Sequence, residues 1–454
     1  MDKKGKSTVM RKLVLCSVAL GLATALADSH LDWFTEARFG MFIHFGAYSL
    51  PARHEWVKNY EGLTDEDYQK YIDNFDPDLF DAKAWVKAAK DAGMRYIVLT
   101  TKHHEGFCLF DSKYTDYKST KTPFGRDLVR EFADACHEAG MRCGFYYSLL
   151  DWHHPDYTID YWYPGHRFKK EREYYDKLNV GRDFPKYVDY LHNQVRELLT
   201  NYGKVDILWY DFTAFDDSSF KDTFKVTEDW RGVELMKLTR ELQPGIVVND
   251  RLGSGVRGDV HTPEQVKEPK WPEKDGVRYP AWETCQTFSG SWGYFRDEAT
   301  WKSPRQLIVM LVDTVSKGGN LILNVGPTGR GTFDARALDR LAAIGGWMKF
   351  NGRSVYGCTE APKDIPVPEG TLLTYNPKTN RLYVHILEYP VKELPFKFAD
   401  RVKYAQLLHD ASEVRIIQPK DINGDVRKGV DASFRLPVVK PDVEVPVIEI
   451  MLKD

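Results

Sequence analysis

Short apolar runs alternate along the chain with longer segments whose apolar residues recur at helical spacing. Each run has the length of a strand, and each intervening segment is long enough for a helix. Strands that alternate with helices in this way predict parallel β-α units. The runs span residues 39–45, 96–101, 142–149, 205–212, 246–250, 281–287 and 321–325.

Seven or eight such units favour a closed (β/α)8-like, TIM-type barrel over an open doubly wound sheet. No glycine-rich phosphate loop follows any of the runs, which disfavours a nucleotide-binding sheet. In a barrel, side chains at the carboxyl ends of the strands converge on one mouth. The candidate chemistry is therefore expected at the ends of the runs.

Two helical segments carry clear boundary signals. The first is predicted to begin at Asp76-Pro77, an N-cap with a favoured first-turn proline, and to end at Gly93. The last is predicted at residues 334–350. The apolar positions are Leu79, Trp85, Val86 and Ala89 in the first segment, and Leu338, Leu341, Ile344 and Met348 in the last.

The pattern changes after Tyr356, where helical periodicity ends and Pro, Gly, Asn and Asp separate short strands. This change predicts a C-terminal antiparallel β-sandwich. We therefore expect a catalytic barrel domain at residues 28–355 and a sandwich domain at residues 356–454. The short strands are expected at residues 371–375, 382–387, 404–408 and 447–451.

The N-terminal residues 1–27 have the composition of a secretory signal peptide. Basic residues precede an apolar stretch at 13–23, and Ala25-Leu26-Ala27 fits the small-x-small cleavage rule. The stretch is too short to span a membrane. A lipoprotein cysteine at Cys16 fits less well, because Leu15 is a poor residue to precede it. We expect export, to the periplasm or the medium, after cleavage near Ala27.

Bulk composition excludes some classes of partner. The formal net charge of −3 offers no basic excess to neutralise phosphates, which argues against nucleic acid. Aromatic residues make up 13% of the chain. Their rings serve either core packing or stacking on flat ligands such as sugars, and composition alone does not separate the two.

After the expected cleavage the chain retains an odd, sparse set of cysteines, which does not form a disulfide framework. Pairing of Cys136 with Cys143 is one alternative, but we expect buried free thiols. None of the cysteines has the spacing of a zinc site, and we expect neither a metal nor a cofactor. The cysteines are Cys108, Cys136, Cys143, Cys285 and Cys358.

A carboxylate ends the fourth apolar run. Residues two apart on a strand share a face, so Val205, Ile207, Trp209 and Asp211 are predicted to form one row. An aspartate among aromatic residues is costly to ionise unless it is hydrogen-bonded. The alternative role, a helix cap in the next turn, is disfavoured because Phe212 does not open a clear helix.

Histidines follow the first two runs. His44 lies at the end of the first run, with Glu55 and Trp56 in the next loop, and His103 and His104 end the second run. Adjacent residues on a strand point to opposite faces, so the two consecutive histidines make a poor metal pair unless the strand has curled into a loop. Hydrogen bonds to a polyol are the favoured role.

Later strand ends add a cation and two further carboxylates. Arg251 ends the fifth run, Glu264 follows on a loop, and Glu283 lies in the sixth run, with Trp292 beyond it. Paired carboxylates with aromatic walls and polyol-binding side chains are typical of glycoside hydrolysis.

Together these segments resemble the glycoside hydrolase family 29 α-L-fucosidases, in consistent order from about Leu31 to Tyr356. The C-terminal part is similar only in its general β character. The motifs are MFIHFG at 41–46, HEW at 54–56, KHHEG at 102–106, YYS at 146–148, LWYD at 208–211, NDR at 249–251, WETC at 282–285, SWGY at 291–294 and GNLILNVGP at 319–327.

The resemblance implies a retaining, exo-acting double displacement on one terminal fucose. It places the nucleophile on Asp211 and the acid/base on Glu264, with Glu283 in reserve. Retention requires carboxyl groups about 5–5.5 Å apart, against about 6.5–9.5 Å for inversion. The implied pocket residues are His44, Glu55, Trp56, His103, His104, Tyr146, Trp209, Arg251 and Trp292.

Further expectations concern substrates and alternatives. An apolar patch of Trp or Phe side chains is expected to favour the fucose methyl group. Residues 152–154 and the charged, aromatic stretch 157–181 follow the third run on the mouth side. They are either a contact for the leaving-group sugar or a solvated insertion. The partners expected are fucosylated oligosaccharides or glycoconjugates, without stable membrane insertion. The alternatives are a non-catalytic carbohydrate-binding protein, a retaining hydrolase of a related sugar such as α-L-galactose and, more remotely, a metal-dependent hydrolase.

Overall fold

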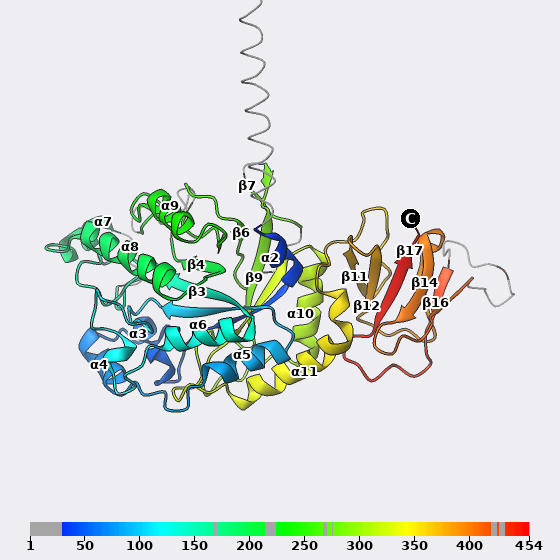
Figure 1. Ribbon diagram of the computed structural model, residues 1–454, viewed down its shortest axis with the longest axis horizontal. Helices are drawn as coiled ribbons and strands as arrows, with labels where there is room; N and C mark the ends of the chain where they lie inside the picture. Colours follow the sequence, from blue (N-terminus) through cyan, green and yellow to red (C-terminus); the bar gives the residue numbers. More distant parts are fainter. Residues whose placement is uncertain are drawn as a thin grey trace, which may run out of the picture.

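The computed structural model describes residues 30–166, 171–213, 224–253, 255–266, 270–274, 276–418, 425 and 432–453. The predicted signal segment, with Cys16 and the cleavage site at Ala27, lies outside the described residues. Figure 1 shows a larger α/β body and a smaller all-β part beside helices α10 (Pro304–Ser316) and α11 (Ala335–Asn351).

The larger body is a parallel β-barrel. Its eight strands are hydrogen-bonded in the order β5-β4-β3-β2-β1-β10-β9-β6. A parallel bridge between Asn249 and Val260 joins the two ends of this order, so the barrel closes. The strands are β1 (Phe39–Ile43), β2 (Tyr96–Lys102), β3 (Arg142–Ser148), β4 (Ile207–Asp211), β5 (Val247–Val248), β6 (Val260–His261), β9 (Ala281–Thr287) and β10 (Asn320–Val325).

The predicted TIM-type barrel is thus confirmed, with one strand that the pattern did not reveal. Strand β6 has two residues, Val260 and His261, in a segment predicted to be a loop. Two residues carry no periodic signal, and β6 is defined by its pairing with β9. Glu264 therefore follows a barrel strand, and Asp211 is the last residue of another.

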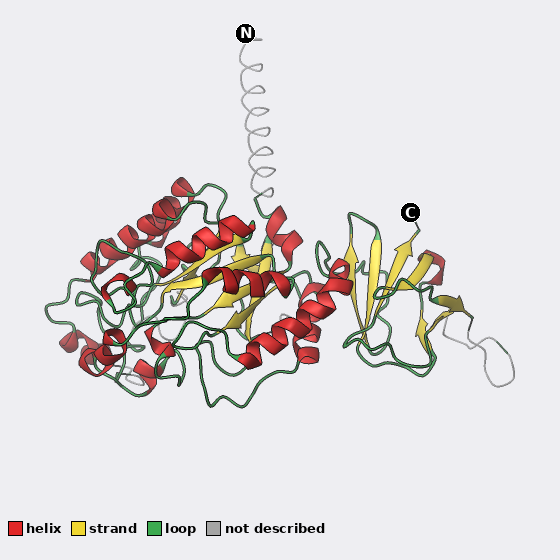
Figure 2. Ribbon diagram, turned by 60° about the horizontal axis from the view of Figure 1, so that its bottom comes forward, coloured by secondary structure: helices red, strands yellow, loops and turns green. Residues whose placement is uncertain are grey.

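Helices cover the outside of the barrel, and Figure 2 shows them around the yellow strands. Among the described residues, no helix lies between β5 and β6 or between β6 and β9, where a short hairpin of β7 (Glu273–Lys274) and β8 (Val277–Arg278) occurs instead. The remaining helices are α2 (Asp32–Ala37), α3 (Val57–Tyr60), α4 (Asp65–Asp73), α5 (Ala82–Asp91), α6 (Leu128–Ala139), α7 (Arg172–Leu178), α8 (Phe184–Asn201) and α9 (Gly232–Leu242), with 3₁₀ turns Ala47–Ser49, Ser119–Lys121, Gly352–Ser354 and Ala399–Arg401.

The first predicted helix begins later than its sequence signal indicated. Asp81, with an extended backbone, caps α5 by accepting hydrogen bonds from the N–H groups of Lys83 and Ala84. Asp76-Pro77 instead begins a turn, and Leu79 is 48% exposed. The last predicted helix is confirmed as α11, capped by Asp334.

Side chains of β4 alternate between two cores, as the strand period requires. Ile207 and Trp209 belong to the cluster inside the barrel, whereas Leu208 and Tyr210 pack in the outer layer against the helices. Val205 also packs in the outer layer, so its predicted place in the row of Asp211 is wrong. The reason is that β4 begins only at Ile207, and the strand alternation does not extend back to Val205.

The C-terminal part is an antiparallel sandwich, as predicted. A four-stranded sheet, β11-β12-β17-β14, and a three-stranded sheet, β13-β16-β15, share one apolar core. The domain boundary at residue 356 stays a prediction. The strands are β11 (Thr371–Asn376), β12 (Arg381–Ile386), β13 (Glu393–Phe396), β14 (Val402–Leu407), β15 (Arg415–Ile417), β16 (Ala432–Arg435) and β17 (Val447–Leu452).

Both faces of the four-stranded sheet are packed against other parts of the protein. Leu382 and Val384 of β12 face the sandwich core, whereas Tyr383 packs with the barrel helices. Trp347 of α11 donates a 2.9 Å hydrogen bond to the carbonyl of Val445, so the sandwich is anchored to the last barrel helix.

Two further observations concern the whole described chain. All five described cysteines are buried and free, which confirms the expectation of free thiols. In the part of the chain that the structure describes, none of the helices combines the length and the apolar character that a membrane span needs.

Candidate active site

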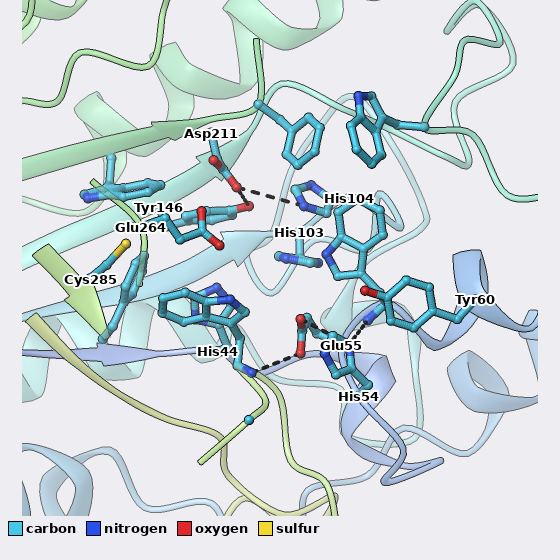
Figure 3. Close-up of a pocket in the computed structure, with 17 residues that line it drawn as sticks. His44, His54, Glu55, Tyr60, His103, His104, Tyr146, Asp211, Glu264 and Cys285 are labelled. Atoms are coloured by element: carbon cyan, nitrogen blue, oxygen red, sulfur yellow. Dashed lines mark hydrogen bonds and ion pairs between the residues drawn. The ribbon is translucent and has the colours of Figure 1, made fainter. Parts of the chain in front are cut away.

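The carboxyl ends of the barrel strands surround one pocket (Figure 3). Each strand places its last residues at this mouth, which is where barrel enzymes carry their chemistry. The pocket is lined by Phe42, His44, His54, Glu55, Trp56, Tyr60, His103, His104, Tyr146, Trp162, Trp209, Asp211, Phe212, Glu264, Cys285, Gly290 and Trp292.

Asp211, the last residue of β4, is held by two donors. Arg251 Nη1 donates to its Oδ1 at 2.9 Å, and the Tyr146 hydroxyl donates to its Oδ2 at 2.8 Å. Burial raises the pKa of Asp211; the charge of Arg251 opposes this rise, that of Glu264 adds to it, and the Tyr146 hydrogen bond lowers the pKa again. The carboxylate is therefore desolvated but has partners that stabilise its ionised form.

Arg251 connects the two candidate carboxylates. The same Nη1 atom donates to Glu264 Oε2, also at 2.9 Å. The two acceptor oxygens are therefore separated by less than twice that distance. Such a separation is below the roughly 6.5–9.5 Å typical of inverting glycosidases and compatible with the roughly 5–5.5 Å of retaining ones.

Arg251 is itself fixed on three sides. Its Nε and Nη2 donate to the hydroxyl and the carbonyl of Thr262, at 3.2 and 3.0 Å, and its guanidinium lies 4.4 Å from the ring of Trp209. Asp250 accepts hydrogen bonds from the N–H and the hydroxyl of Thr262. These contacts tie the end of β5 to the segment that carries Glu264.

Glu264 is held by backbone hydrogen bonds on either side of it, and its carboxylate is held by Arg251. Cys285 of β9 donates its N–H to the carbonyl of Pro263 and accepts the N–H of Gln265, so the two hydrogen bonds bracket Glu264. Gln265 has a φ of 56°, a left-handed conformation that turns the chain away after Glu264. The Glu264 side chain is 46% exposed, which leaves it open to solvent and ligand.

The two consecutive histidines both line the pocket, because the strand has curled into a loop before them, as the sequence pattern allowed. Strand β2 ends at Lys102, and the N–H of Gly106 donates to the carbonyl of His103, so the chain has already turned. Gly106 has a φ of 83°, which suits glycine. As a result the His103 and His104 ring centroids lie only 3.9 Å apart.

Burial favours the neutral forms of His44 and His104. Burial, followed by the charge of His103, lowers the pKa of His44 and of His104 well below the usual value. Neutral imidazoles exchange hydrogen bonds with hydroxyl groups without adding a charge to the pocket. The described residues contain no group of three or more His, Cys, Asp or Glu side chains arranged to hold a metal ion.

Glu55 combines two functions at the pocket wall. Its Oε2 accepts hydrogen bonds from the N–H groups of Trp292 and Gly293, at 3.2 and 2.8 Å, and thereby holds the loop that carries Trp292. Its Oε1 lies 3.2 Å from His54 Nδ1. Glu55 thus fixes the wall opposite Asp211, as Figure 3 shows.

Most of the predicted site residues line this one pocket. Of those named from the sequence, Arg251 contacts both carboxylates without being part of the lining, and Glu283 lies elsewhere. Glu283 is fully buried inside the barrel and accepts a hydrogen bond from Tyr96. Burial raises the pKa of Glu283 to about 8, so it is a buried neutral acid rather than a group at the mouth.

The sequence reasoning missed several lining residues. Phe42 could have been predicted, because it lies two residues before His44 in the first apolar run, at the spacing that puts side chains on one face. Trp162 lies in the stretch 157–181 that was expected on the mouth side, and Phe212 directly follows Asp211, but neither was named as a pocket residue. Trp152 and His153, predicted to contact a leaving group, are not in the lining: Trp152 is fully buried, and His153 stacks on Tyr117.

Comparison with known proteins identifies the family. The alpha-L-fucosidase family model matches residues 23–353 of the sequence. The chain belongs to the alpha-L-fucosidase family. It is accordingly a glycoside hydrolase, and the resemblance inferred from the motifs is confirmed.

Relatives of this fucosidase extend over most of its length. Human plasma alpha-L-fucosidase is 30% identical over 416 residues, which cover 85% of this chain and 81% of the human protein. Alpha-L-fucosidase isoenzyme 1 from Paenibacillus thiaminolyticus is 44% identical, with a TM-score of 0.84 over 94% of this chain and 100% of that chain.

A second structural relative bears on the reaction. An alpha-L-fucosidase from Bacteroides thetaiotaomicron, solved as a trapped covalent intermediate with 2-fluoro-fucosyl fluoride, is 28% identical, with a TM-score of 0.78 over 94% of this chain and 96% of that chain. A covalent glycosyl-enzyme is the hallmark of retention. The family and this relative together support retaining fucosidase chemistry for the present chain.

Proposed function

We propose that this fucosidase removes single terminal α-L-fucosyl residues from glycans, with Asp211 as nucleophile and Glu264 as acid/base. The observation that carries the assignment is the shared donor: Arg251 Nη1 contacts both carboxylates at 2.9 Å, so they lie close together in the lining of one pocket. Glu283, the reserve candidate, is buried inside the barrel and is disfavoured.

In the first step Asp211 attacks the anomeric carbon while Glu264 gives its proton to the departing glycosidic oxygen. Arg251 and Tyr146 keep the Asp211 carboxylate ionised and aimed before attack. Attack converts the Asp211 carboxylate into a neutral ester and leaves Glu264 ionised, so the positive charge of Arg251 then stabilises the Glu264 carboxylate.

In the second step Glu264 accepts a proton from a water molecule that attacks the anomeric carbon and releases Asp211. The two displacements restore the original anomeric configuration. The Glu264 side chain is 46% exposed, which suits a group that must meet both a leaving group and water.

Aromatic side chains support the choice of a deoxy sugar. The Phe42 ring lies 5.3 Å from that of Trp209 and 6.2 Å from that of Trp292, both in edge-to-face geometry, and all three line the pocket. An apolar wall of this kind favours a methyl group over a hydroxymethyl group by a modest factor, roughly 10–200-fold. α-L-Galactosides are the closest competing substrates.

The cellular setting follows from the sequence. The signal-like residues 1–27 favour export, with the barrel at 28–355 and the sandwich at 356–454 in the mature protein. Fucosylated oligosaccharides and glycoconjugates outside the cytoplasm are then the expected substrates.

The test is a panel of aryl glycosides followed by proton NMR of the first product anomer. We expect cleavage of the α-L-fucoside with retention, and slower cleavage of the α-L-galactoside. Asp211→Ala should abolish turnover, and added azide should restore it through a fucosyl azide. Inverted product would refute the double displacement, and ligand binding without turnover of any glycoside would favour the non-catalytic alternative.

A further inference from the structure

Two pocket histidines have their ring hydrogens fixed by protein partners. His44 Nδ1 lies 2.6 Å from Asn324 Oδ1, an oxygen that can only accept, because the Asn324 amide nitrogen donates to the carbonyl of Trp292. The hydrogen of neutral His44 is therefore on Nδ1. Its Nε2 is left as a hydrogen-bond acceptor.

His104 follows the same pattern. Its Nδ1 lies 2.7 Å from the Ser148 hydroxyl, and that hydroxyl donates its own hydrogen to the carbonyl of Leu150 at 3.0 Å. Ser148 therefore accepts from His104 Nδ1–H. The remaining nitrogen, Nε2, lies 3.9 Å from Asp211 and is again an acceptor.

His103, the third histidine of the group, has a different neighbour. Its Nδ1 is buried and makes no hydrogen bond with proper geometry, and the carboxylate oxygen Oε2 of Glu105 lies 3.4 Å away. Both oxygens of Glu105 are buried and equally without a hydrogen bond, and Glu105 is only 1% exposed. Two orphaned polar groups that face each other at this distance need only a small rotation to form a charge-assisted hydrogen bond.

The surroundings leave Glu105 no better partner. Burial, followed by the charge of Glu105, raises the pKa of Tyr48, Tyr68 and Tyr117 well above the usual value. No hydrogen bond joins any of these phenols to Glu105, and the Tyr68 hydroxyl is itself without a partner. A side chain at Gly46 would approach Glu105 Oε1 to 3.0 Å, so the carboxylate is also tightly enclosed.

We propose that Glu105 is a positioning residue that keeps the ring hydrogen of His103 on Nδ1. His44, His103 and His104 then all present Nε2 lone pairs to the pocket and together accept hydrogen bonds from three hydroxyl groups. Catalytic hydrogen bonds are often long in the unliganded enzyme and tighten when substrate binds, which is the expected behaviour of the 3.4 Å pair.

This inference rests on the proposed function, because it takes the ligand to be a sugar rich in hydroxyl donors. The groups that face His103 are Glu105 at 3.4 Å, the rings of His104, Tyr48, His44 and Tyr146, and, through its charge, Asp211. Glu105 is the carboxylate beside Nδ1. It is thus the group that decides which nitrogen carries the hydrogen.

The test separates the charge of Glu105 from its shape. Glu105→Gln keeps the shape without the charge, and Glu105→Asp keeps the charge on a shorter side chain. We expect Glu105→Gln to lower kcat/KM for an aryl α-L-fucoside by about 10–100-fold and Glu105→Asp to lower it less. Glu197→Gln is the matched control: Glu197 is also buried, with partners at Ser112 and Lys113, and should keep wild-type activity.

A second measurement reads the tautomer without any substrate. Long-range proton–nitrogen NMR of enzyme labelled with 15N-histidine, with His103 assigned by loss of its signals in His103→Gln, should show the hydrogen on Nδ1 in the wild type. In Glu105→Gln it should move, at least in part, to Nε2.

The outcomes are distinct. Wild-type kcat/KM in Glu105→Gln, or a hydrogen on Nε2 of His103 in the wild-type enzyme, would overturn the proposal. If Glu105→Gln does not fold, the wild-type NMR spectrum still shows which nitrogen of His103 carries the hydrogen and so tests the proposal. A failure of the wild type to cleave any α-L-fucoside would instead refute the proposed function and leave the tautomer result unaffected.

Discussion

Tyr146 donates a 2.8 Å hydrogen bond to Asp211 from the neighbouring strand of the barrel. In the register of β3 and β4, Tyr146 lies opposite Trp209, and Asp211 is two residues further on, so both side chains point inward. Burial, followed by the charge of Asp211, raises the pKa of Tyr146 well above the usual value, which keeps the phenol protonated as a donor.

Removal of this donor in Tyr146→Phe should make Asp211 harder to ionise. The hydrogen bond lowers the pKa of Asp211, so its loss leaves burial less opposed and raises that pKa further. We expect the acid limb of the kcat/KM profile to move to higher pH by about one unit, and kcat/KM at the optimum to fall about 10-fold.

The next residue on the same strand provides the control. Tyr147 points to the outer face and donates a 2.8 Å hydrogen bond to Gln194. Tyr147→Phe should cost about 1 kcal/mol in the free energy of unfolding and leave the acid limb in place. An equal shift of the limb in both variants would show that Tyr146 acts through general stability only.

Glu264→Ala should affect substrates according to their leaving groups. A dinitrophenyl fucoside needs little protonation, so its first step should stay fast and give a burst, while the second step slows by about 10²–10⁴-fold. For a substrate with a poor leaving group, the rates of both steps should fall. Stopped-flow measurement of the released phenol checks this, and an identical loss for all leaving groups would assign proton transfer to another residue.

Glu283→Gln should change the pH dependence of stability. The pKa of Glu283 is raised from 4.5 to about 8, so its protonated form favours the folded state fully below about pH 4.5, and this contribution is lost as pH rises to about 8. The wild type should lose about 1.4 kcal/mol per pH unit through this group in that window. The variant should lack this slope in urea unfolding at pH 5, 6 and 7; parallel curves for both proteins would contradict the assignment.

Removal of one partner from the buried Lys102–Asp151 pair should be strongly destabilising. Lys102 Nζ lies 3.1 Å from Asp151 Oδ2, with the two side chains 0% and 2% exposed. Asp151→Asn leaves an uncompensated buried ammonium and should lower the free energy of unfolding by about 3–5 kcal/mol.

The comparison is Asp91→Asn, which breaks the exposed Lys87–Asp91 pair on α5, where the side chains are 72% and 62% exposed. Water already screens this pair, so chemical denaturation should detect no clear change. An equal decrease in the free energy of unfolding of the two variants would mean that burial does not make the loss of the Lys102–Asp151 pair more costly.

Patterns within the chain were enough to predict the barrel and much of its mouth. The strand period predicted seven of the eight barrel strands, and the polar residues at their ends, such as His44 and Asp211, converge because parallel strands point the same way. The roles assigned to Asp211 and Glu264 came from the resemblance to a family and stay proposals.

Contacts between distant segments were beyond sequence reasoning. A two-residue strand, β6, has no period and exists through its neighbour β9. The close contact between the His103 and His104 rings and the burial of Glu283 depend on where other elements lie. So does the entry of Trp162, out of the whole aromatic stretch 157–181, into the pocket.

Residue identity and spacing set the secondary structure and the kinds of side chains at the strand ends. The sequence by itself therefore determined the barrel, the sandwich and the chemical groups available at the mouth of the barrel. The tertiary structure decided which groups share a partner: that one arginine nitrogen contacts both carboxylates, and that Glu105 faces His103. The physical reason is that hydrogen bonds and pKa values depend on distances of a few ångströms between residues far apart in the chain, and only packing sets those distances.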